Sequence, residues 1–142
     1  MADTLSMRVW IDTNVLIDFI AEREGFVEDA QLVLSLCDGV VDGYISVLSF
    51  ANIAYIFRKS ADASTLGFIK DQMCSVLHFA DCTEGDIDKA IALNYYDFED
   101  ALQTAGAIRV GADCRVTRNK SDFKNSPIPV FTPRELAKTI LL

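Results

Sequence analysis

The chain has 142 residues, of which 51% are hydrophobic and 24% charged, and its formal net charge is −8. This length is typical of one globular domain, and no apolar stretch approaches the roughly 18 to 20 residues of a membrane span. The acidic balance argues against a protein that holds nucleic acid by bulk positive charge, but it is compatible with a site that recruits metal cations.

Hydrophobic periodicity predicts strands that alternate with helices. In chain order we expect a strand at 7–11, helices at 13–20 and within 23–39, a strand at 43–47, helices at 49–60 and 62–74, a strand at 75–80, helices at 83–93 and 97–112, strands at 114–117 and 129–132, and a helix at 133–142. Ser49 is a candidate helix cap, and Thr83 with Asp86 resembles a capping box.

This alternation predicts a mainly parallel central sheet of about five strands with helices on both faces, a three-layer α/β/α arrangement. We expect one domain over residues 7–142 after a disordered leader at 1–6. No signal peptide or membrane segment is expected, and we predict a cytoplasmic protein.

The cysteines and the single histidine do not suggest a soft-ligand metal site. No two of the four cysteines have a Cys-x-x-Cys spacing, and we interpret them as reduced, partly buried thiols: Cys37, Cys74, Cys82 and Cys114. His78 alone cannot build a histidine-rich zinc site.

Carboxylates and other oxygen donors instead gather at predicted strand ends and helix starts. Asp12 follows the first strand, Asp97 and Asp100 lie three residues apart in "YYDFEDALQ", and Asp122 follows the strand 114–117. Each has a local alternative: Asp12 as a helix N-cap, the pair as acids of a first helical turn, and Asp122 in a capped turn. Glu99 is expected to point away from Asp100 into solvent.

Taken together, these acids predict a hard-oxygen site. In parallel α/β sheets ligands bind outside the carboxyl ends of the strands, where Asp12 and Asn119 should both emerge. Carboxylates without convergent His or Cys suit Mg²⁺ or Mn²⁺. A divalent cation would relieve their mutual repulsion and stabilise charge on a phosphoryl group. A basic stretch near the C-terminus is either a solvated face or a phosphate-binding rim, and it contains Arg109, Arg115, Arg118, Lys120 and Lys124.

Four segments, "WIDTNVLIDF", "ISVLSFANI", "DFEDALQTAGA" and "VTRNKSDF", resemble the ordered motifs of PIN-domain nucleases, which include the toxin ribonucleases of VapBC-type toxin–antitoxin pairs. The resemblance runs from Met7 to about Pro133. It implies a three-layer fold and metal-dependent hydrolysis of RNA, leaving 5′-phosphate and 3′-hydroxyl ends. The acidic metal ligands of the family motifs correspond to Asp12, Asp100 and Asp122 in this sequence.

The second acid of the family does not match. Asn52 lies six residues after Ser46, where the family usually has Glu. Together with the segment "DFEDAL", this Asn resembles a PIN subgroup that has Asn at that position. Asp97, one turn from Asp100, is predicted to supply the missing charge. The expected supporting residues are Asn52, Thr13, Asn14, Thr117 and Asn119, and the expected RNA contacts are Arg118 and Lys120.

The favoured interpretation is a Mg²⁺- or Mn²⁺-dependent endoribonuclease, a toxin with RNA as substrate, a cognate antitoxin as partner and a homodimeric state. One alternative is a PIN fold that binds RNA or protein without cleaving, as the neutral Asn52 suggests. The other is a dehalogenase-like phosphatase, but its general acid would fall on Asn14, whose amide cannot supply a proton.

Overall fold

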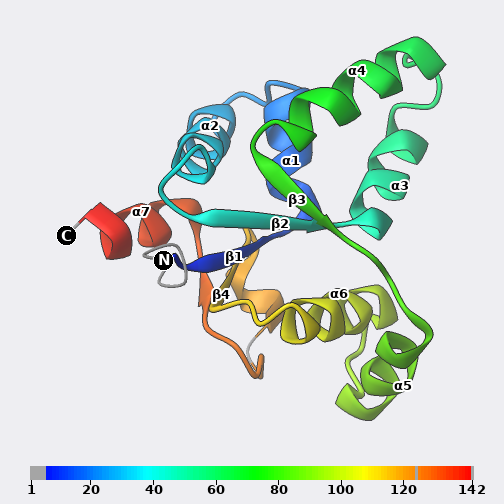
Figure 1. Cartoon of the computed structure of the whole chain (residues 1–142), viewed down its shortest axis with the longest axis vertical. Helices are drawn as coiled ribbons and strands as arrows, with labels where there is room; N and C mark the ends of the chain where they lie inside the picture. Colours follow the sequence, from blue (N-terminus) through cyan, green and yellow to red (C-terminus); the bar gives the residue numbers. More distant parts are fainter. Residues whose placement is uncertain (1–5, 124, 142) are drawn as a thin grey trace.

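A central parallel sheet organises the molecule (Figure 1). The computed structural model describes residues 6–123 and 125–141, so most of the expected leader lies outside the described residues. The strand order is β3-β2-β1-β4-β5, and every neighbouring pair is parallel. The strands are β1 (Arg8–Ile11), β2 (Asp42–Ser46), β3 (Leu77–Ala80), β4 (Cys114–Val116) and β5 (Val130–Phe131). The predicted fold class is confirmed.

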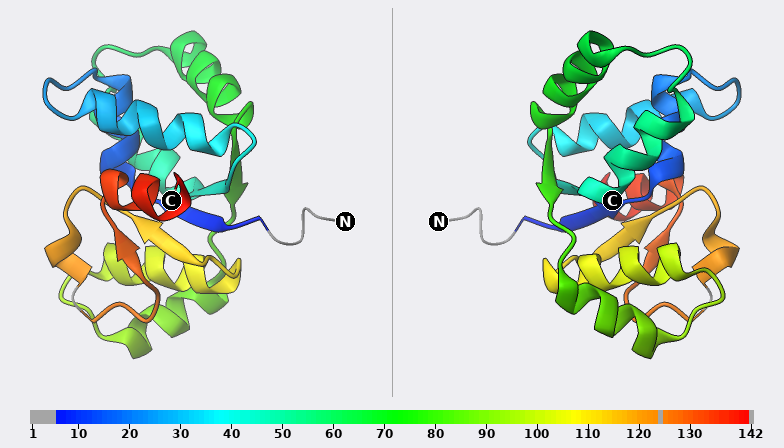
Figure 2. Two further views of the ribbon diagram at one scale, coloured as in Figure 1. Left: turned by 90° about the vertical axis from the view of Figure 1, so that its left-hand side faces the viewer. Right: turned by 90° about the vertical axis from the view of Figure 1, so that its right-hand side faces the viewer.

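Helices cover both faces of this sheet (Figures 1 and 2). On one side lie α1 (Thr13–Ile20), α2 (Val27–Cys37), α3 (Val47–Ile56), α4 (Ala63–Cys74) and α7 (Pro133–Leu141). On the other side α5 (Glu84–Leu93) packs against α6 (Phe98–Arg109). A short 3-10 helix, η2 (Lys120–Phe123), follows β4. None of the described helices is long and apolar enough to cross a membrane.

The central strand β1 is buried on both faces because helices cover the sheet from both sides. Val9 and Ile11 belong to the larger hydrophobic core, which also contains residues of α1, α2 and α7. Trp10 points to the opposite face and packs with Ala107 of α6. Gly106 permits this close approach, since a Cβ added there would lie 2.9 Å from Cη2 of Trp10. Side chains of β1 point alternately to the two faces of the sheet, so Trp10 packs against α6 and positions the helix that carries Asp97 and Asp100.

Local capping was predicted correctly at α5 and wrongly at α3. Thr83 and Asp86 form the expected reciprocal capping box. The side chain that caps α3 is Ser46, whose Oγ accepts from the Leu48 amide at 2.9 Å, whereas Ser49 is fully buried within the helix. The helix starts earlier than expected because β2 runs directly into it. Ser49 is therefore free to take part in a polar network at the sheet edge.

Candidate functional site at the carboxyl edge of the sheet

The carboxyl ends of the parallel strands form one edge, which α3 and α6 border on either side (right view of Figure 2). Asp12 follows β1 directly, and Thr117 follows β4. Helix α6 runs back toward β4, so its N-terminal turn, with Asp97 and Asp100, lies at the same edge. The sheet topology therefore gathers the predicted site residues of distant segments at one end of the molecule.

Asp12 occupies the N-cap position of α1, but its carboxylate makes no capping hydrogen bond. Its Oδ1 accepts from Nη2 of Arg115 at 3.0 Å. Its Oδ2 accepts from the Thr117 hydroxyl at 2.7 Å and from the Asn14 amide at 3.2 Å. The helix-cap alternative for Asp12 is therefore wrong, and the carboxylate points into the polar site instead.

Three of the expected supporting residues hold this carboxylate in place. The Asn14 amide also donates to Oγ1 of Thr117 at 3.2 Å, while its Oδ1 accepts from the backbone of Arg118. Asn119 takes part through its backbone N–H, which donates to Oγ1 of Thr117 at 3.1 Å. Asn14 thus acts as a hydrogen-bond bridge, an arrangement that leaves the dehalogenase interpretation without its general acid.

A second network links Thr13 to Asn52 through buried side chains. The Thr13 and Ser49 hydroxyls lie 2.8 Å apart, and Nε2 of Gln103 donates to Ser49 at 3.0 Å. The same Nε2 donates to Oε2 of Glu99 at 3.1 Å. The Asn52 amide donates to that oxygen as well, at 2.8 Å. This network joins α1, α3 and α6 across the mouth of the site.

The expectation that Glu99 is solvated is therefore wrong. Glu99 is partly buried, and its carboxylate lies directly against Asn52, the position where the acid was missing. The available signal was the four-residue spacing of Glu99 and Gln103, which puts both on one helical face, together with the amide at Asn52 as a donor. Which helix would lie opposite that face is decided by the tertiary fold.

Asp97, Asp100 and Asp122 line a common cavity of about 620 Å³ between α6 and η2. Asp97 is the N-cap of α6, and its Oδ1 accepts from the Glu99 amide at 2.9 Å. The local alternative for Asp97, an acid that stabilises a helix start, thus describes part of its role. Asp122 is exposed in η2, where its side chain faces the cavity rim.

The electrostatics of the cavity are most visible at Asp100. Its pKa is raised to about 6: burial has the largest effect, the neighbouring charges of Asp97, Asp12 and Glu99 also raise the pKa, and the Arg115 guanidinium lowers it. A proton is therefore held unusually tightly at this site. A cation bound beside Asp100 would relieve the repulsion from its acidic neighbours.

We expect Asp100→Asn to stabilise the metal-free protein at neutral pH. Because the folded-state pKa of Asp100 is raised to about 6, its contribution to stability is present below the unfolded value of 3.8 and is lost as the pH rises through 6. The asparagine of Asp100→Asn does not ionise, so the variant does not lose this stability as the pH rises. After allowance for solvent screening, urea unfolding in EDTA should show a relative gain of roughly 1–2 kcal/mol between about pH 4 and about pH 7.5.

Asp71→Asn, an exposed change on α4, is the matched control for this comparison. The stability difference between Asp71→Asn and the wild type should stay nearly constant over the same pH range. A constant difference for Asp100→Asn as well would contradict the raised pKa.

The two side chains predicted to contact RNA are already paired with acids. Arg118 donates from Nε to the buried Asp18 at 2.8 Å, and its guanidinium lies 4.4 Å from the ring centre of Phe26. Lys120 contacts Glu135 at 3.1 Å, with both side chains about half exposed. An exposed pair contributes less than about 1 kcal/mol, so Lys120 is the freer of the two to exchange its partner for a phosphate.

The available ligand atoms suit a hard divalent cation, because those described at this edge are carboxylate, hydroxyl and amide oxygens. Within residues 6–123 and 125–141, however, no three His, Cys, Asp or Glu side chains are grouped as a ready-made metal site. The site therefore fits a cation chemically, and binding requires the side chains to draw together.

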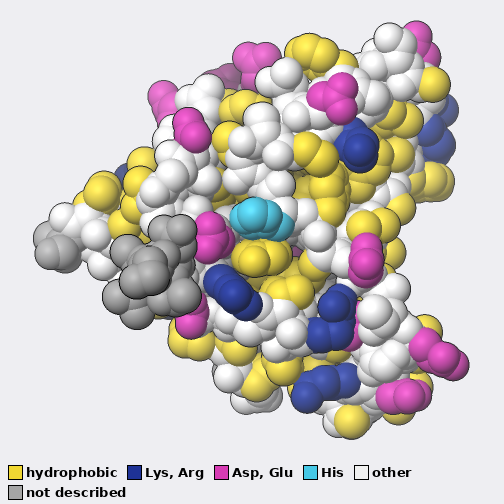
Figure 3. Space-filling model, in the orientation of Figure 1, with side chains coloured by type: hydrophobic (Ala, Val, Ile, Leu, Met, Phe, Trp, Pro, Cys, Tyr) yellow, Lys and Arg dark blue, Asp and Glu magenta, His cyan; other side chains and the backbone are white. Residues whose placement is uncertain are grey.

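The soft ligands of the chain lie elsewhere. His78, the cyan side chain of Figure 3, is on the surface beside Tyr44. All four cysteines are free, with Cys37 and Cys114 buried and the other two exposed. Burial raises the pKa of the Cys37 and Cys114 thiols to about 12, so both stay protonated and inert at neutral pH.

Comparison with known protein families identifies the fold. The family model described as PIN domain matches residues 8–121. This range includes every strand except β5, and it includes Asp12, Asp97 and Asp100 but not Asp122. This chain belongs to the PIN domain family. No curated protein matches the chain. Membership of this family suggests a nuclease, as the sequence resemblance implied.

Solved structures show the same fold at low sequence identity. A toxin–antitoxin complex from Klebsiella pneumoniae is 22% identical with a TM-score of 0.67, covering 88% of this chain and 97% of that one. VapBC2 from Rickettsia felis, bound to a DNA fragment from its promoter, is 21% identical with a TM-score of 0.68 and the same coverages. VapC20 from Mycobacterium tuberculosis, described as a toxin that cleaves the sarcin–ricin loop, is 12% identical with a TM-score of 0.59, covering 75% and 86%.

Proposed function

We propose that this PIN domain is a divalent-metal-dependent endoribonuclease and the toxin component of a toxin–antitoxin pair. The observation that carries the proposal is the convergence of Asp12, Asp97, Asp100 and Asp122 at the carboxyl edge of a PIN fold, where burial and then the acidic neighbours raise the pKa of Asp100. Toxin–antitoxin complexes among the similar structures support an antitoxin partner, and the sarcin–ricin-cleaving toxin supports RNA as substrate. A homodimer is part of the same proposal.

Asp12, Asp100 and Asp122 are the residues that would hold Mg²⁺ or Mn²⁺. A bound cation would supply charge stabilisation for the phosphoryl group and activation of water. The chain's own groups do the positioning: Thr117 and Asn14 orient Asp12 through hydrogen bonds of 2.7 and 3.2 Å, and Asn119 orients Thr117 in turn. Such supporting partners fix the direction of a ligand's lone pairs.

The carboxylate that makes up for Asn52 is Glu99 in this proposal. Its Oε2 accepts from Asn52 of α3 and from Gln103, so the Glu99 carboxylate lies against the position where the sequence resemblance expects the second acid. Asp97, which sequence spacing had favoured for this role, lines the cavity and caps α6. We keep Asp97 as an assisting acid, and we propose that this Asn–Glu pair characterises the subgroup that the sequence resembles.

Cleavage of RNA by the purified chain tests the proposal. Asp100→Asn and Asp122→Asn should each lower the rate in Mn²⁺ at least about 100-fold, because losing even a supporting partner costs roughly 10- to 100-fold. Glu99→Gln should slow cleavage more than Asp97→Asn. The products should carry 5′-phosphates, EDTA should abolish the reaction, and Asp71→Asn should cleave like the wild type.

A binding module without catalysis is the alternative, and two observations favour it: Asn52 carries no charge, and Asp12 is already paired with Arg115. In that case RNA would bind with no metal-dependent turnover. Cleavage that persists in EDTA, or that is equal in Asp100→Asn and the wild type, would count against the nuclease proposal and indicate a contaminating activity.

A further inference from the structure

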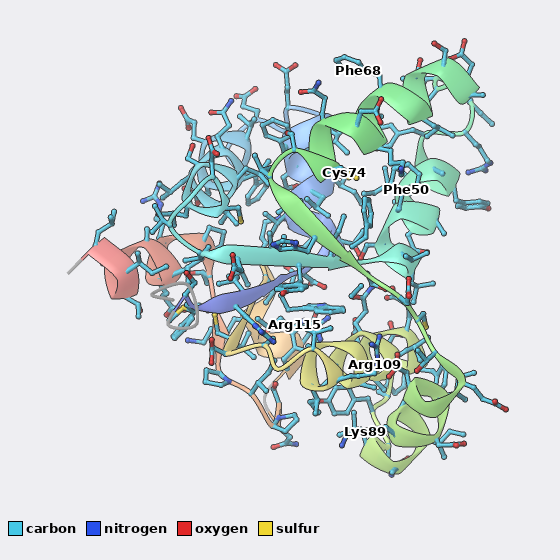
Figure 4. The ribbon with its side chains drawn as sticks, in the orientation of Figure 1. Phe50, Phe68, Cys74, Lys89, Arg109 and Arg115 are labelled. Carbon is cyan, nitrogen blue, oxygen red and sulfur yellow. The ribbon has the colours of Figure 1, made fainter. Side chains whose placement is uncertain are left out.

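A fully buried arginine lies at the centre of the acidic site. Arg115 belongs to β4, and its side chain lies between β1 and α6 (Figure 4). Burying a guanidinium is costly unless an opposite charge and hydrogen bonds compensate it. Its ion-pair partner among the described residues is Asp12, whose Oδ1 lies 3.0 Å from Nη2.

The guanidinium contacts each segment that carries a predicted metal ligand. Besides Asp12 at the end of β1, it donates from Nη1 to the Thr104 hydroxyl at 2.8 Å, and Thr104 in turn donates to the backbone oxygen of Asp100 at 2.9 Å. Its carbon centre lies 3.9 Å from the ring centre of Phe123 in η2. A single positive charge thus joins β1, α6 and η2.

Hydrogen bonding alone does not explain this placement. Nε of Arg115 is buried and has no hydrogen-bond partner among the described residues, although arginine is usually buried where its planar guanidinium is well satisfied. What the position does offer is charge: the guanidinium lies 3.0 Å from the Asp12 carboxylate and is linked through the Thr104 hydroxyl to the helical turn that carries Asp100. Arg115 therefore lies where a cation would be expected to balance these carboxylates.

We propose that Arg115 is the built-in counter-cation of this site: its guanidinium neutralises Asp12 in the metal-free protein and must release Oδ1 of Asp12 when a divalent cation binds. The inference rests on the proposed metal-dependent function and names the residue that regulates it. Arg115 stabilises the metal-free fold and lowers the affinity for metal, because guanidinium and cation compete for the same oxygen. The site is then occupied only when the cation concentration is high enough to displace the ion pair.

Titration of Mn²⁺ by calorimetry into the full chain tests the competition directly. Arg115→Met keeps an unbranched side chain of similar length and removes the charge, so we expect Mn²⁺ to bind at least about tenfold more tightly than to the wild type. Saturating Mn²⁺ should also raise the Tm of Arg115→Met by more than it raises that of the wild type.

Arg109→Met is the matched control. Arg109 on α6, also labelled in Figure 4, makes a similar ion pair, with Nε 3.0 Å from Oδ1 of the buried Asp86 on α5. This variant removes the same charge from the protein but not from the site. Its Mn²⁺ affinity should match that of the wild type.

A second measurement uses the wild-type chain and covers the case in which Arg115→Met does not fold. The Nε resonance of Arg115, assigned by its loss in Arg115→Lys, should shift when diamagnetic Mg²⁺ is added, because the guanidinium leaves Asp12. A resonance that stays unchanged to saturation would overturn the proposal.

Calorimetry gives equally clear contrary results. Unchanged or weaker Mn²⁺ binding by folded Arg115→Met, equal tightening in Arg109→Met, or no binding by either the wild type or Arg115→Met would each overturn it. These readouts do not depend on RNA cleavage. Tighter binding in Arg115→Met without any ribonuclease activity would support the counter-cation and refute the proposed nuclease.

Discussion

Asp12→Asn is expected to lower the free energy of unfolding by about 3 kcal/mol in the absence of metal, because it leaves the buried Arg115 guanidinium without its charge partner. The asparagine oxygen can still accept a hydrogen bond, which keeps the loss near the lower end of the range for broken buried pairs. Cleavage of RNA should fall at least about 100-fold as well, since loss of a supporting partner alone costs roughly 10- to 100-fold. Urea unfolding in EDTA and initial cleavage rates in Mn²⁺ measure the two effects.

The sign of the stability change separates Asp12 from Asp100. Both are acids of one site, yet the neutral substitution should destabilise at Asp12 and stabilise at Asp100, because Asp12 has the guanidinium as partner whereas Asp100 faces mainly other acids. Adding Arg115→Met to Asp12→Asn should recover about 2 kcal/mol, as expected for residues in direct contact. Equal losses of stability in Asp12→Asn and Asp100→Asn would contradict the ion pair as the cause. So would a double variant Asp12→Asn/Arg115→Met that is no more stable than Asp12→Asn.

Gln103→Leu is the second change with a large expected effect, a loss of about 3 kcal/mol in the free energy of unfolding. The Gln103 side chain is 2% exposed; its Oε1 accepts from Nε1 of Trp10 at 3.1 Å, and its Nε2 donates to Ser49 and Glu99. Leucine fills a similar volume but leaves the buried indole N–H without its partner. Each orphaned buried group costs roughly 1–3 kcal/mol.

Trp10 is the single tryptophan of the chain, so its fluorescence reports directly on this contact during urea unfolding. Loss of the hydrogen bond should change the emission of folded Gln103→Leu, and cleavage should slow because Glu99 loses one of its donors. Gln72→Leu, an exposed change on α4, serves as control and should stay within about 0.5 kcal/mol of the wild type. A similarly small effect for Gln103→Leu would mean that the network does not hold the site.

Features that depend on neighbouring residues in the chain were predictable from sequence. The strand-then-helix pattern gave the parallel sheet, because apolar alternation and helical spacing are local properties. The capping box of Thr83 and Asp86 was recognisable because its two partners lie three residues apart. Asp12 and Asn119 were expected at the same edge because parallel strands all end on one side, and there the backbone N–H of Asn119 donates to the Thr117 hydroxyl, which donates to Asp12.

The partners of the charged side chains were decided by tertiary structure alone. Asp12 with Arg115 and Asp18 with Arg118 are each pairs about 100 residues apart in the chain, and Asn52 with Glu99 spans 47. Arg115 belongs to a basic stretch that looked like a solvated face or a phosphate-binding rim, yet β4 carries it into the interior. A three-residue strand is too short for alternation to reveal its burial, and all three residues of β4 are buried because the strand lies between β1 and β5 and α6 covers Arg115. The sequence by itself thus predicted that Asp12, Asp97, Asp100 and Asp122 lie at this edge. The folded structure decided that Glu99 joins them and which charge neutralises Asp12, because hydrogen bonds and ion pairs depend on distances that only packing defines.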